Sequence, residues 1–312
     1  MRDRLVTVFG GGGFVGRYVV QALLRGGARV RIAQRDPRQA WFLKPLGGLG
    51  QTQFVAADVT RADTVANAVA GADAVVNLVG VLSGKFDAIH VAGAHTVAHA
   101  ATDVGVGALI HLSAIGADPD SASDYGRSKG LGEAAVRAAF PGANIVRPSI
   151  VFGREDAFIN RFAGMIAKAP VVPVVRSGTK FQPVFVADVG DAVAALINGG
   201  HAGEAFDLAG PDVMTMGEII RWIATTIQRD PAMVALPDVA SALIARAGFL
   251  PGAPITWDQW LMLQRDNIAA PGAKGLSDLG ITPTPLAAVA PEWLVRFRRQ
   301  GRFARRVDNL VA

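Results

Sequence analysis

The strongest constraint on the fold is a glycine-rich segment, FGGGGFVG, that joins a predicted strand to a predicted helix near the start of the chain. It carries the pattern GxxGxxG at Gly10, Gly13 and Gly16. Gly10 permits a tight turn, Gly13 lets a pyrophosphate approach the backbone, and Gly16 lets the helix pack closely on the strand. Phe14 and Val15 open the helix, whose free N–H groups and positive dipole end would face the phosphates. In this strand–turn–helix setting, the pattern predicts a loop that binds a dinucleotide.

Apolar strands and helical stretches alternate along the first half of the chain. The six predicted strands are 4–9, 28–34, 52–59, 72–81, 107–116 and 143–153. The clearest helical stretches between them are 61–70, 87–104 and 124–139. This alternation is typical of a parallel sheet with helices on both faces. We therefore predict an α/β fold with a doubly wound parallel sheet of the Rossmann type.

The rhythm changes after Gly153, where helical pieces separated by proline and glycine take over. A helix is expected over 156–170, and a strand and then a helix over 181–197, with Asp188 placed to cap that helix. We predict a dinucleotide-binding domain over residues 1–155, to which 182–199 returns. Residues 156–181 and 200–312 would form a smaller, mainly helical C-terminal lobe with a basic tail, covering the carboxyl edge of the sheet.

The end of the second predicted strand, RIAQRDP, bears on which dinucleotide binds. An acid at this position binds the ribose hydroxyls of NAD, whereas an arginine suits the 2′-phosphate of NADP. Arg35 stands at or just past the strand end and offers a planar fork to phosphate oxygens, and Asp36 follows it. The sequence therefore favours NADP(H), with NAD(H) as the alternative. Asp58 and Val59 end the third strand, where Asp58 either contacts the adenine or begins the next turn.

Three side chains with catalytic potential converge on the carboxyl edge of the predicted sheet. Ser113 ends the fifth strand, and Tyr125 and Lys129 lie four residues apart on one face of the next helix. The Lys129 ammonium would stabilise the phenolate and lower the pKa of Tyr125 from its ordinary value of about 10. Tyr125 could then act as general acid or base on a carbonyl or alcohol, with Ser113 bonded to the same oxygen. In a quieter alternative, Lys129 binds the nicotinamide ribose without any turnover.

Composition narrows the partners that this chain can have. There is no cysteine, and His90, His95 and His99 share a predicted helix, with Asp87 at its start, but lack the further ligands that a metal site needs, so no metal site is predicted. The net charge is +5, and the tail RFRRQGRFARR is either a solvated segment or a patch that docks on anionic lipid or an acidic protein. Nucleic-acid binding is not predicted, because no aromatic platform accompanies these arginines. No apolar run reaches the roughly 18 residues of a membrane span, so we expect a soluble or peripherally bound protein.

The order of these motifs matches a known superfamily. The glycine loop, VVNLVG, Ser113, the Tyr125–Lys129 pair and RPSIVFG occur as in the short-chain dehydrogenase/reductases, and the chain resembles their extended or atypical branch. By this resemblance Leu78, Val79 and Gly80 line the cofactor. Pro148 lies in the segment that borders the nicotinamide and the substrate cleft. Ser113, Tyr125 and Lys129 would touch the cofactor as well.

A narrower resemblance covers nearly the whole chain. Segments such as YGRSKGLGE and LGITPTPLAAVAPEWLVRFR are similar to the NADPH-binding accessory subunit family of respiratory complex I. The resemblance implies an NADP(H)-binding complex I subunit with a mainly structural nucleotide, held peripherally at the cytoplasmic face of the inner membrane against other complex I subunits. Because Ser113, Tyr125 and Lys129 are all present, a free NADP-dependent reductase or epimerase/dehydratase stays open. A regulator that reads the NADPH/NADP ratio through a partner is a third possibility.

Overall fold

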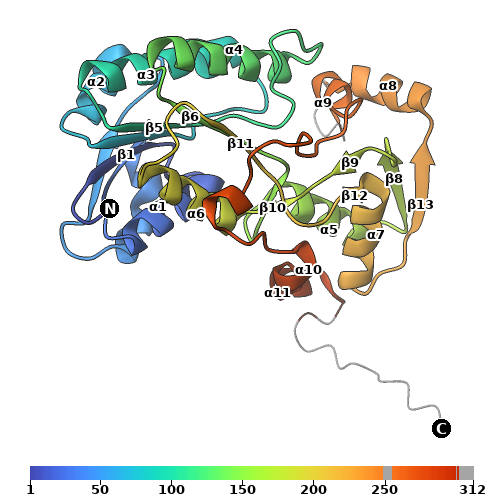
Figure 1. The fold of residues 1–312 in the computed structure, drawn as a ribbon. Coiled ribbons are helices and arrows are strands. Elements are labelled where there is room, and N and C mark those ends of the chain that lie inside the picture. The colour runs from blue at the N-terminus through green and yellow to red at the C-terminus, as the bar shows by residue number, and fades with distance from the viewer. Residues whose placement is uncertain (249–254, 300, 302–312) are drawn as a thin grey trace.

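The computed structural model describes residues 1–248, 255–299 and 301 (Figure 1). Seven strands form one sheet in the order β11-β6-β5-β4-β1-β2-β3, and every neighbouring pair runs parallel. The strands are β1 (Leu5–Phe9), β2 (Arg29–Gln34), β3 (Thr52–Ala56), β4 (Ala74–Asn77), β5 (Ala108–Leu112), β6 (Asn144–Pro148) and β11 (Ala205–Leu208). The predicted doubly wound parallel sheet is confirmed.

Helices cover both faces of this sheet, as the alternation predicted (Figure 1). The first layer holds α1 (Phe14–Arg25) and α6 (Val186–Ile197), and the second holds α2 (Ala62–Val69), α3 (Ala94–Asp103) and α4 (Asp124–Ala139). Alternate residues of β1 serve opposite layers: Val6 and Val8 pack with the first, and Phe9 packs with the second. Such strands are buried on both sides, which is why they read as continuous apolar runs.

The predicted helix over 87–104 is divided in the structure. Its first part, η2 (Asp87–Gly93), is a π-helical turn, and α3 continues from it without a break. Turns of this kind are rare and occur often at functional sites. The 3₁₀ segment η1 (Pro37–Leu46) follows β2, and neither feature has a clear local signature in the sequence.

The lobe stands beside the carboxyl edge of the sheet and has its own apolar core (Figure 1). Its helices are α5 (Phe158–Lys168), α7 (Met216–Thr226), α8 (Asp238–Arg246), α9 (Trp257–Met262), α10 (Leu286–Val289) and α11 (Pro291–Leu294), with short 3₁₀ segments η3 (Ser277–Leu279) and η4 (Val295–Phe297). Three two-stranded sheets accompany them: β7 (Val151–Phe152) with β10 (Val184–Phe185), β8 (Val171–Val175) with β13 (Ala232–Leu236), and β9 (Lys180–Phe181) with β12 (Met214–Thr215). Within the described ranges, no helix is long and apolar enough to cross a bilayer.

Two expectations about the second half are wrong. Residues 205–208 were expected in the lobe, but β11 pairs with β6 and completes the main sheet. Asp188 was expected to cap α6, but Phe185 is the N-cap residue and no side chain caps the helix. Asp188 is buried and accepts hydrogen bonds from the backbone N–H (2.7 Å) and hydroxyl (2.9 Å) of Thr284. It therefore ties the C-terminal segment to α6.

The basic tail is described only at its start. There Arg296 donates to the Asn160 side chain (2.8 Å) and Arg298 donates to the carbonyl of Thr226 (3.2 Å), so both are bound to the lobe. Arg302, Arg305 and Arg306 lie outside the described residues.

Candidate functional site

The glycine loop lies where β1 and β4 separate at the carboxyl edge of the sheet, which is the usual ligand position in open parallel sheets. Gly10 has a φ of +77°, and a Cβ added there would lie 3.4 Å from the carbonyl carbon of Leu78. A Cβ at Gly16 would overlap the carbonyl oxygen of Gly10. Gly13 is the N-cap residue of α1, and no side chain caps this helix. The first turn of α1 thus leaves its N–H groups for an anion such as a pyrophosphate.

Gln34 holds this loop in shape. Its Oε1 accepts a hydrogen bond from the N–H of Gly12 (3.1 Å), and its Nε2 donates to the carbonyl of Asp36 (2.7 Å). A Cβ at Gly12 would overlap the Gln34 amide, so a larger residue there would displace Gln34 from the loop. The sequence interpretation passed over Gln34, because a glutamine at a strand end has no motif of its own.

The residues predicted near the adenosine have distinct partners. Asp36 is the N-cap residue of η1 and binds Arg38 through both carboxylate oxygens (2.9 and 3.0 Å), which lowers the pKa of Asp36. Arg35 is exposed beside them. Asp58 accepts hydrogen bonds from the N–H (2.9 Å) and hydroxyl (2.8 Å) of Thr60. These bonds lower its pKa, and Arg35 adds a smaller electrostatic contribution. Asp58 therefore begins the next turn, which was one of its two predicted roles.

Val59 is buried, and its side chain would meet a Cβ added at Gly93, where η2 ends, at 2.8 Å. Its side chain packs against η2 and is apolar, so any contact of Val59 with a nucleotide would come from its backbone. Val79 has a comparable supporting place, because its methyl group lies against Gly10 and its N–H donates to the Asn77 side chain (3.1 Å).

Lys129 is buried at the other end of the candidate cleft. Its Nζ donates to the carbonyl of Leu112 (3.1 Å), and a Cβ added at Gly80 would lie 3.3 Å from that Nζ. Burial lowers the pKa of Lys129 to about 8, against a raising effect of Glu133. The structure therefore places Gly80, Lys129 and the end of β5, which precedes Ser113, next to one another.

Tyr125 is packed between rings and has no hydroxyl bond to Lys129 in the described structure. Its ring meets Phe86 (6.1 Å) and His90 (5.6 Å) edge to face. Burial and the charge of Asp258 raise its pKa to about 12. The expected lowering of the pKa is wrong in direction, because burial, and after it the charge of Asp258, disfavour the phenolate. Tyr125 thus keeps its proton at neutral pH and can donate a hydrogen bond.

His90 links the segment that follows β4 to helix α4, which carries Tyr125. Its Nε2 accepts from the N–H of Val81 (3.0 Å), so Nδ1 carries the proton and donates to the Ser128 hydroxyl (2.9 Å). Ser128 in turn donates to the carbonyl of Tyr125 (2.9 Å). Burial, assisted by Lys129, lowers the pKa of His90 to about 4, so the ring is neutral.

The described residues contain no cluster of three or more metal-ligating side chains.

Ser113 adjoins a buried ion network on α4 and β6. Its hydroxyl is buried without a hydrogen-bond partner among the described residues, although it lies close enough to Glu133 to favour that carboxylate. Glu133 accepts from Arg147 (2.8 and 2.6 Å) and Arg137 (3.1 Å). Burial opposes the charge of Glu133, but these bonds outweigh it and its pKa is lowered. Arg147 directly precedes Pro148. The carbonyl of Pro148 accepts a hydrogen bond from the backbone N–H of Ile115, two residues beyond Ser113.

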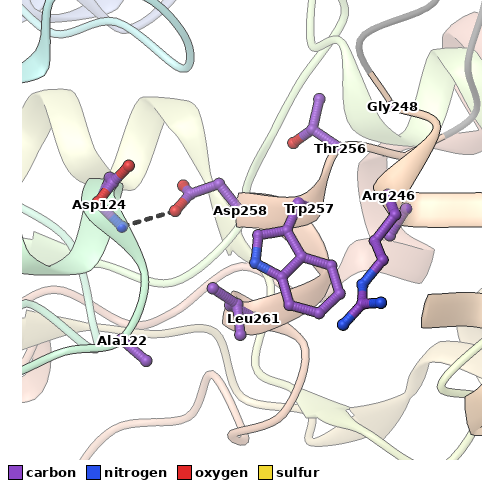
Figure 2. A pocket seen from close by; sticks show the side chains of 9 residues that line it. Ala122, Asp124, Arg246, Gly248, Thr256, Trp257, Asp258 and Leu261 are labelled. Atoms are coloured by element: carbon purple, nitrogen blue, oxygen red, sulfur yellow. Dashed lines mark hydrogen bonds between the residues drawn. The ribbon is translucent and has the colours of Figure 1, made fainter. Parts of the chain in front are cut away.

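A cavity of about 460 Å³ lies where α9 meets the start of α4 (Figure 2). The indole of Trp257 forms one wall, with the Arg246 guanidinium 5.2 Å from the ring centroid. Asp258 forms another wall and bonds to the backbone N–H of Asp124 (2.6 Å) and of Tyr125 (3.3 Å). The lobe therefore contacts the helix that carries Tyr125 and Lys129.

Three comparisons with known proteins agree with this architecture. Residues 6–209 match the model of the NAD dependent epimerase/dehydratase family. The chain is 36% identical over 304 residues to "NADH dehydrogenase [ubiquinone] 1 alpha subcomplex subunit 9, mitochondrial" of Rattus norvegicus, which covers 94% of this chain and 80% of that protein. It is 30% identical over 261 residues to the ceramide reductase of Caulobacter vibrioides, which covers 80% of each.

A solved structure shares the fold. The NADPH-dependent quinone oxidoreductase QOR2 of Escherichia coli, complexed with NADPH, superposes with a TM-score of 0.76 at 19% identity, over 93% of this chain and 99% of that chain. The family match, the glycine loop before the uncapped helix α1 and the parallel sheet lead to one conclusion. The chain belongs to the NAD dependent epimerase/dehydratase family.

Proposed function

We propose that this chain is an NADP(H)-binding accessory subunit of respiratory complex I, in which the nucleotide mainly stabilises the fold. The observation that carries the proposal is the similarity to the alpha subcomplex subunit 9 over 94% of the chain. That similarity extends through the lobe, whereas the family model ends at residue 209. Fold alone supports many functions, so the shared lobe is the informative part.

The residues after β2 support NADP(H) over NAD(H). The acidic candidate for the ribose hydroxyls is Asp36, and its carboxylate is engaged with Arg38 and with the start of η1. Gln34 is engaged with the glycine loop. Arg35 is exposed at this edge, where its guanidinium can bind a 2′-phosphate.

A bound nucleotide would bridge several segments of the chain, which supports a structural role for it. The glycine loop, the segment at Leu78 to Gly80 and helix α4 are separate segments of the chain that meet at the carboxyl edge of the sheet. A ligand bound across them adds its binding free energy to the stability of the folded state. Tyr125 keeps its proton and can donate it in a hydrogen bond. Lys129 spends one of its three N–H donors on Leu112 and adjoins Gly80, so its other donors could bind a ribose.

We place the subunit peripherally on complex I, at the cytoplasmic face of the inner membrane, with other complex I subunits as partners. The mean hydropathy of +0.32 and the exposed apolar side chains of the lobe, such as Val239 (74% exposed) and Leu243 (62% exposed), support a covered surface in the assembly. The tail arginines would assist contact with an acidic or anionic surface.

The alternative is a free NADP-dependent reductase or epimerase/dehydratase that uses Ser113, Tyr125 and Lys129. One observation favours it: the buried Ser113 hydroxyl makes no hydrogen bond within the described residues and only adjoins Glu133, so it can turn toward a substrate oxygen. The similarity to the ceramide reductase adds weight. In that case Tyr125 would donate its proton to the substrate oxygen while the nicotinamide supplied the hydride.

Replacement of Gly13 tests the structural role of the nucleotide. A Cβ at Gly13 would come within 3.2 Å of the Gly10 carbonyl, so Gly13→Val crowds the loop and obstructs the approach of the phosphates. Gly178→Val is the control, because a Cβ there meets nothing within 4 Å. We expect the Gly13 variant to lose bound nucleotide and to lower the amount of assembled complex I on native gels, and the control to do neither. Normal assembly of a nucleotide-free Gly13 variant would contradict the proposal.

A further inference from the structure

The N-terminus of α4 is completed by a residue from the lobe (Figure 2). The two carboxylate oxygens of Asp258 accept hydrogen bonds from the N–H groups of Asp124 (2.6 Å) and Tyr125 (3.3 Å). The N-cap residue Ser123 satisfies the next two N–H groups through its hydroxyl and its carbonyl. Two of the four N–H groups that open the helix therefore depend on a residue that lies 134 positions later in the chain.

The N-termini of α1 and α4 differ in how they are capped. No side chain caps α1, so its N–H groups are left for an anion. Helix α4 is closed by Asp258, whose charge is also favourable at the positive end of the helix dipole. The N–H groups that Asp258 occupies are not available to a ligand. The effect of Asp258 on the site is therefore to hold α4 in place.

Asp258 also affects the proton on Tyr125. The titratable groups around Tyr125 are His90 on η2, Asp258 on α9, and Asp124 and Lys129 on its own helix. Burial is the larger cause of the high pKa of Tyr125, and Asp258 is the other. His90 is neutral and adds no charge. The same carboxylate thus fixes the helix and disfavours the phenolate.

We propose that Asp258 is a positioning residue of the nucleotide site, which holds α4 so that Tyr125 and Lys129 stand at the carboxyl edge of the sheet. The proposal rests on nucleotide binding at that edge. Lys129 lies one turn beyond Tyr125, where its ammonium adjoins Gly80. If Asp258 withdraws, the first turn of α4 loses two hydrogen bonds and the helix loses its link to α9. The lobe therefore supports nucleotide binding from a distance.

NADPH binding tests the positioning role. We expect Asp258→Ala to raise the Kd for NADPH roughly 3- to 30-fold, the size of a lost helix cap, in a fluorescence titration. The matched control is Asp266→Ala, which removes a lobe carboxylate that accepts from the backbone N–H of Lys180 (2.8 Å), away from α4. The control should stay within about twofold of the parent. Asp258→Asn keeps one acceptor oxygen and serves as the variant if the alanine form does not fold.

The ionisation of tyrosine gives a readout that a purely structural role would leave unchanged. The chain has two tyrosines, so the background Tyr18→Phe leaves Tyr125 as the one signal in a ¹³C-tyrosine NMR titration. Removing the charge in Asp258→Asn should lower the pKa of Tyr125 by about one unit. An unchanged tyrosine titration together with an unchanged NADPH Kd would overturn the proposal. A parent protein that binds no NADPH would instead contradict the proposed function, and the tyrosine titration would still decide the role of Asp258.

Discussion

Glu133 is a polar residue whose replacement should lower the stability of the sheet domain. Its carboxylate is 4% exposed and binds Arg147 on β6 and Arg137 one turn further along α4. Glu133→Ala would leave both guanidinium groups without this partner in a partly buried place. Breaking a buried pair costs about 3–5 kcal/mol. Arg147 and Arg137 are 31% and 38% exposed and can regain water, so we expect a loss of about 2–3 kcal/mol.

The effect should depend on pH in a defined direction. The pKa of Glu133 is lowered in the folded state, below the unfolded value of about 4.3. The stability that its charge contributes is therefore present above about pH 4.3 and is lost as the pH falls through the folded pKa. Glu133→Gln keeps hydrogen-bonding capacity without the charge, so its deficit relative to the parent should shrink in acid.

Urea unfolding followed by far-UV circular dichroism measures both effects. The midpoint should fall in Glu133→Ala with an unchanged slope, because the surface exposed on unfolding is the same. Glu204→Ala is the control, since its carboxylate is 30% exposed, against 4% for Glu133, and pairs near the surface with Lys274 and His201, so the midpoint should shift much less. A Glu133→Ala midpoint equal to that of the parent would refute the reasoning that this network is a main tie between α4 and β6.

Two further predictions concern the nucleotide. Arg35→Ala should raise the Kd for NADPH by roughly tenfold or more, because charge-assisted hydrogen bonds to the 2′-phosphate are lost, and leave the Kd for NADH within about twofold. Replacement of the exposed Arg29 by alanine serves as the control. Equal losses of affinity for the two nucleotides would contradict the assignment. Tyr125→Phe should bind NADPH within about threefold of the parent, because one neutral hydrogen bond is removed, and leave respiration and complex I assembly intact. Tyr18→Phe is its control, and a substrate turnover that only Tyr125→Phe abolishes would support the free-enzyme alternative instead.

Local patterns in the sequence predicted the elements that depend on neighbouring residues. The strand–glycine–helix unit and α4 were both identified this way, and α4 spans the 124–139 predicted for it. The predicted strands each contain the observed strands β1 to β6, but β4 is shorter than its predicted range, and the strand predicted over 143–153 is divided into β6 and β7, which lie in different sheets. In each case the apolar period or the glycine spacing lies within one short segment.

Contacts between distant segments account for what was missed. The spacing of Tyr125 and Lys129 gave their common helix face, but it could not show that the carbonyl of Leu112 takes the ammonium. The bonds of Asp258 and Asp188 span 134 and 96 residues, so no local pattern reveals them. His90 was weighed only as a metal ligand, although its place between β4 and α4 is set by tertiary packing.

The most direct measurement is the migration of this chain on a native gel of gently solubilised membranes from the source organism, with mass spectrometry to locate it. We expect the chain to co-migrate with complex I subunits and NADPH to be released from that band on denaturation. Migration as a free species away from complex I would contradict the accessory-subunit function and make Ser113, Tyr125 and Lys129 the presumed active site of an independent enzyme.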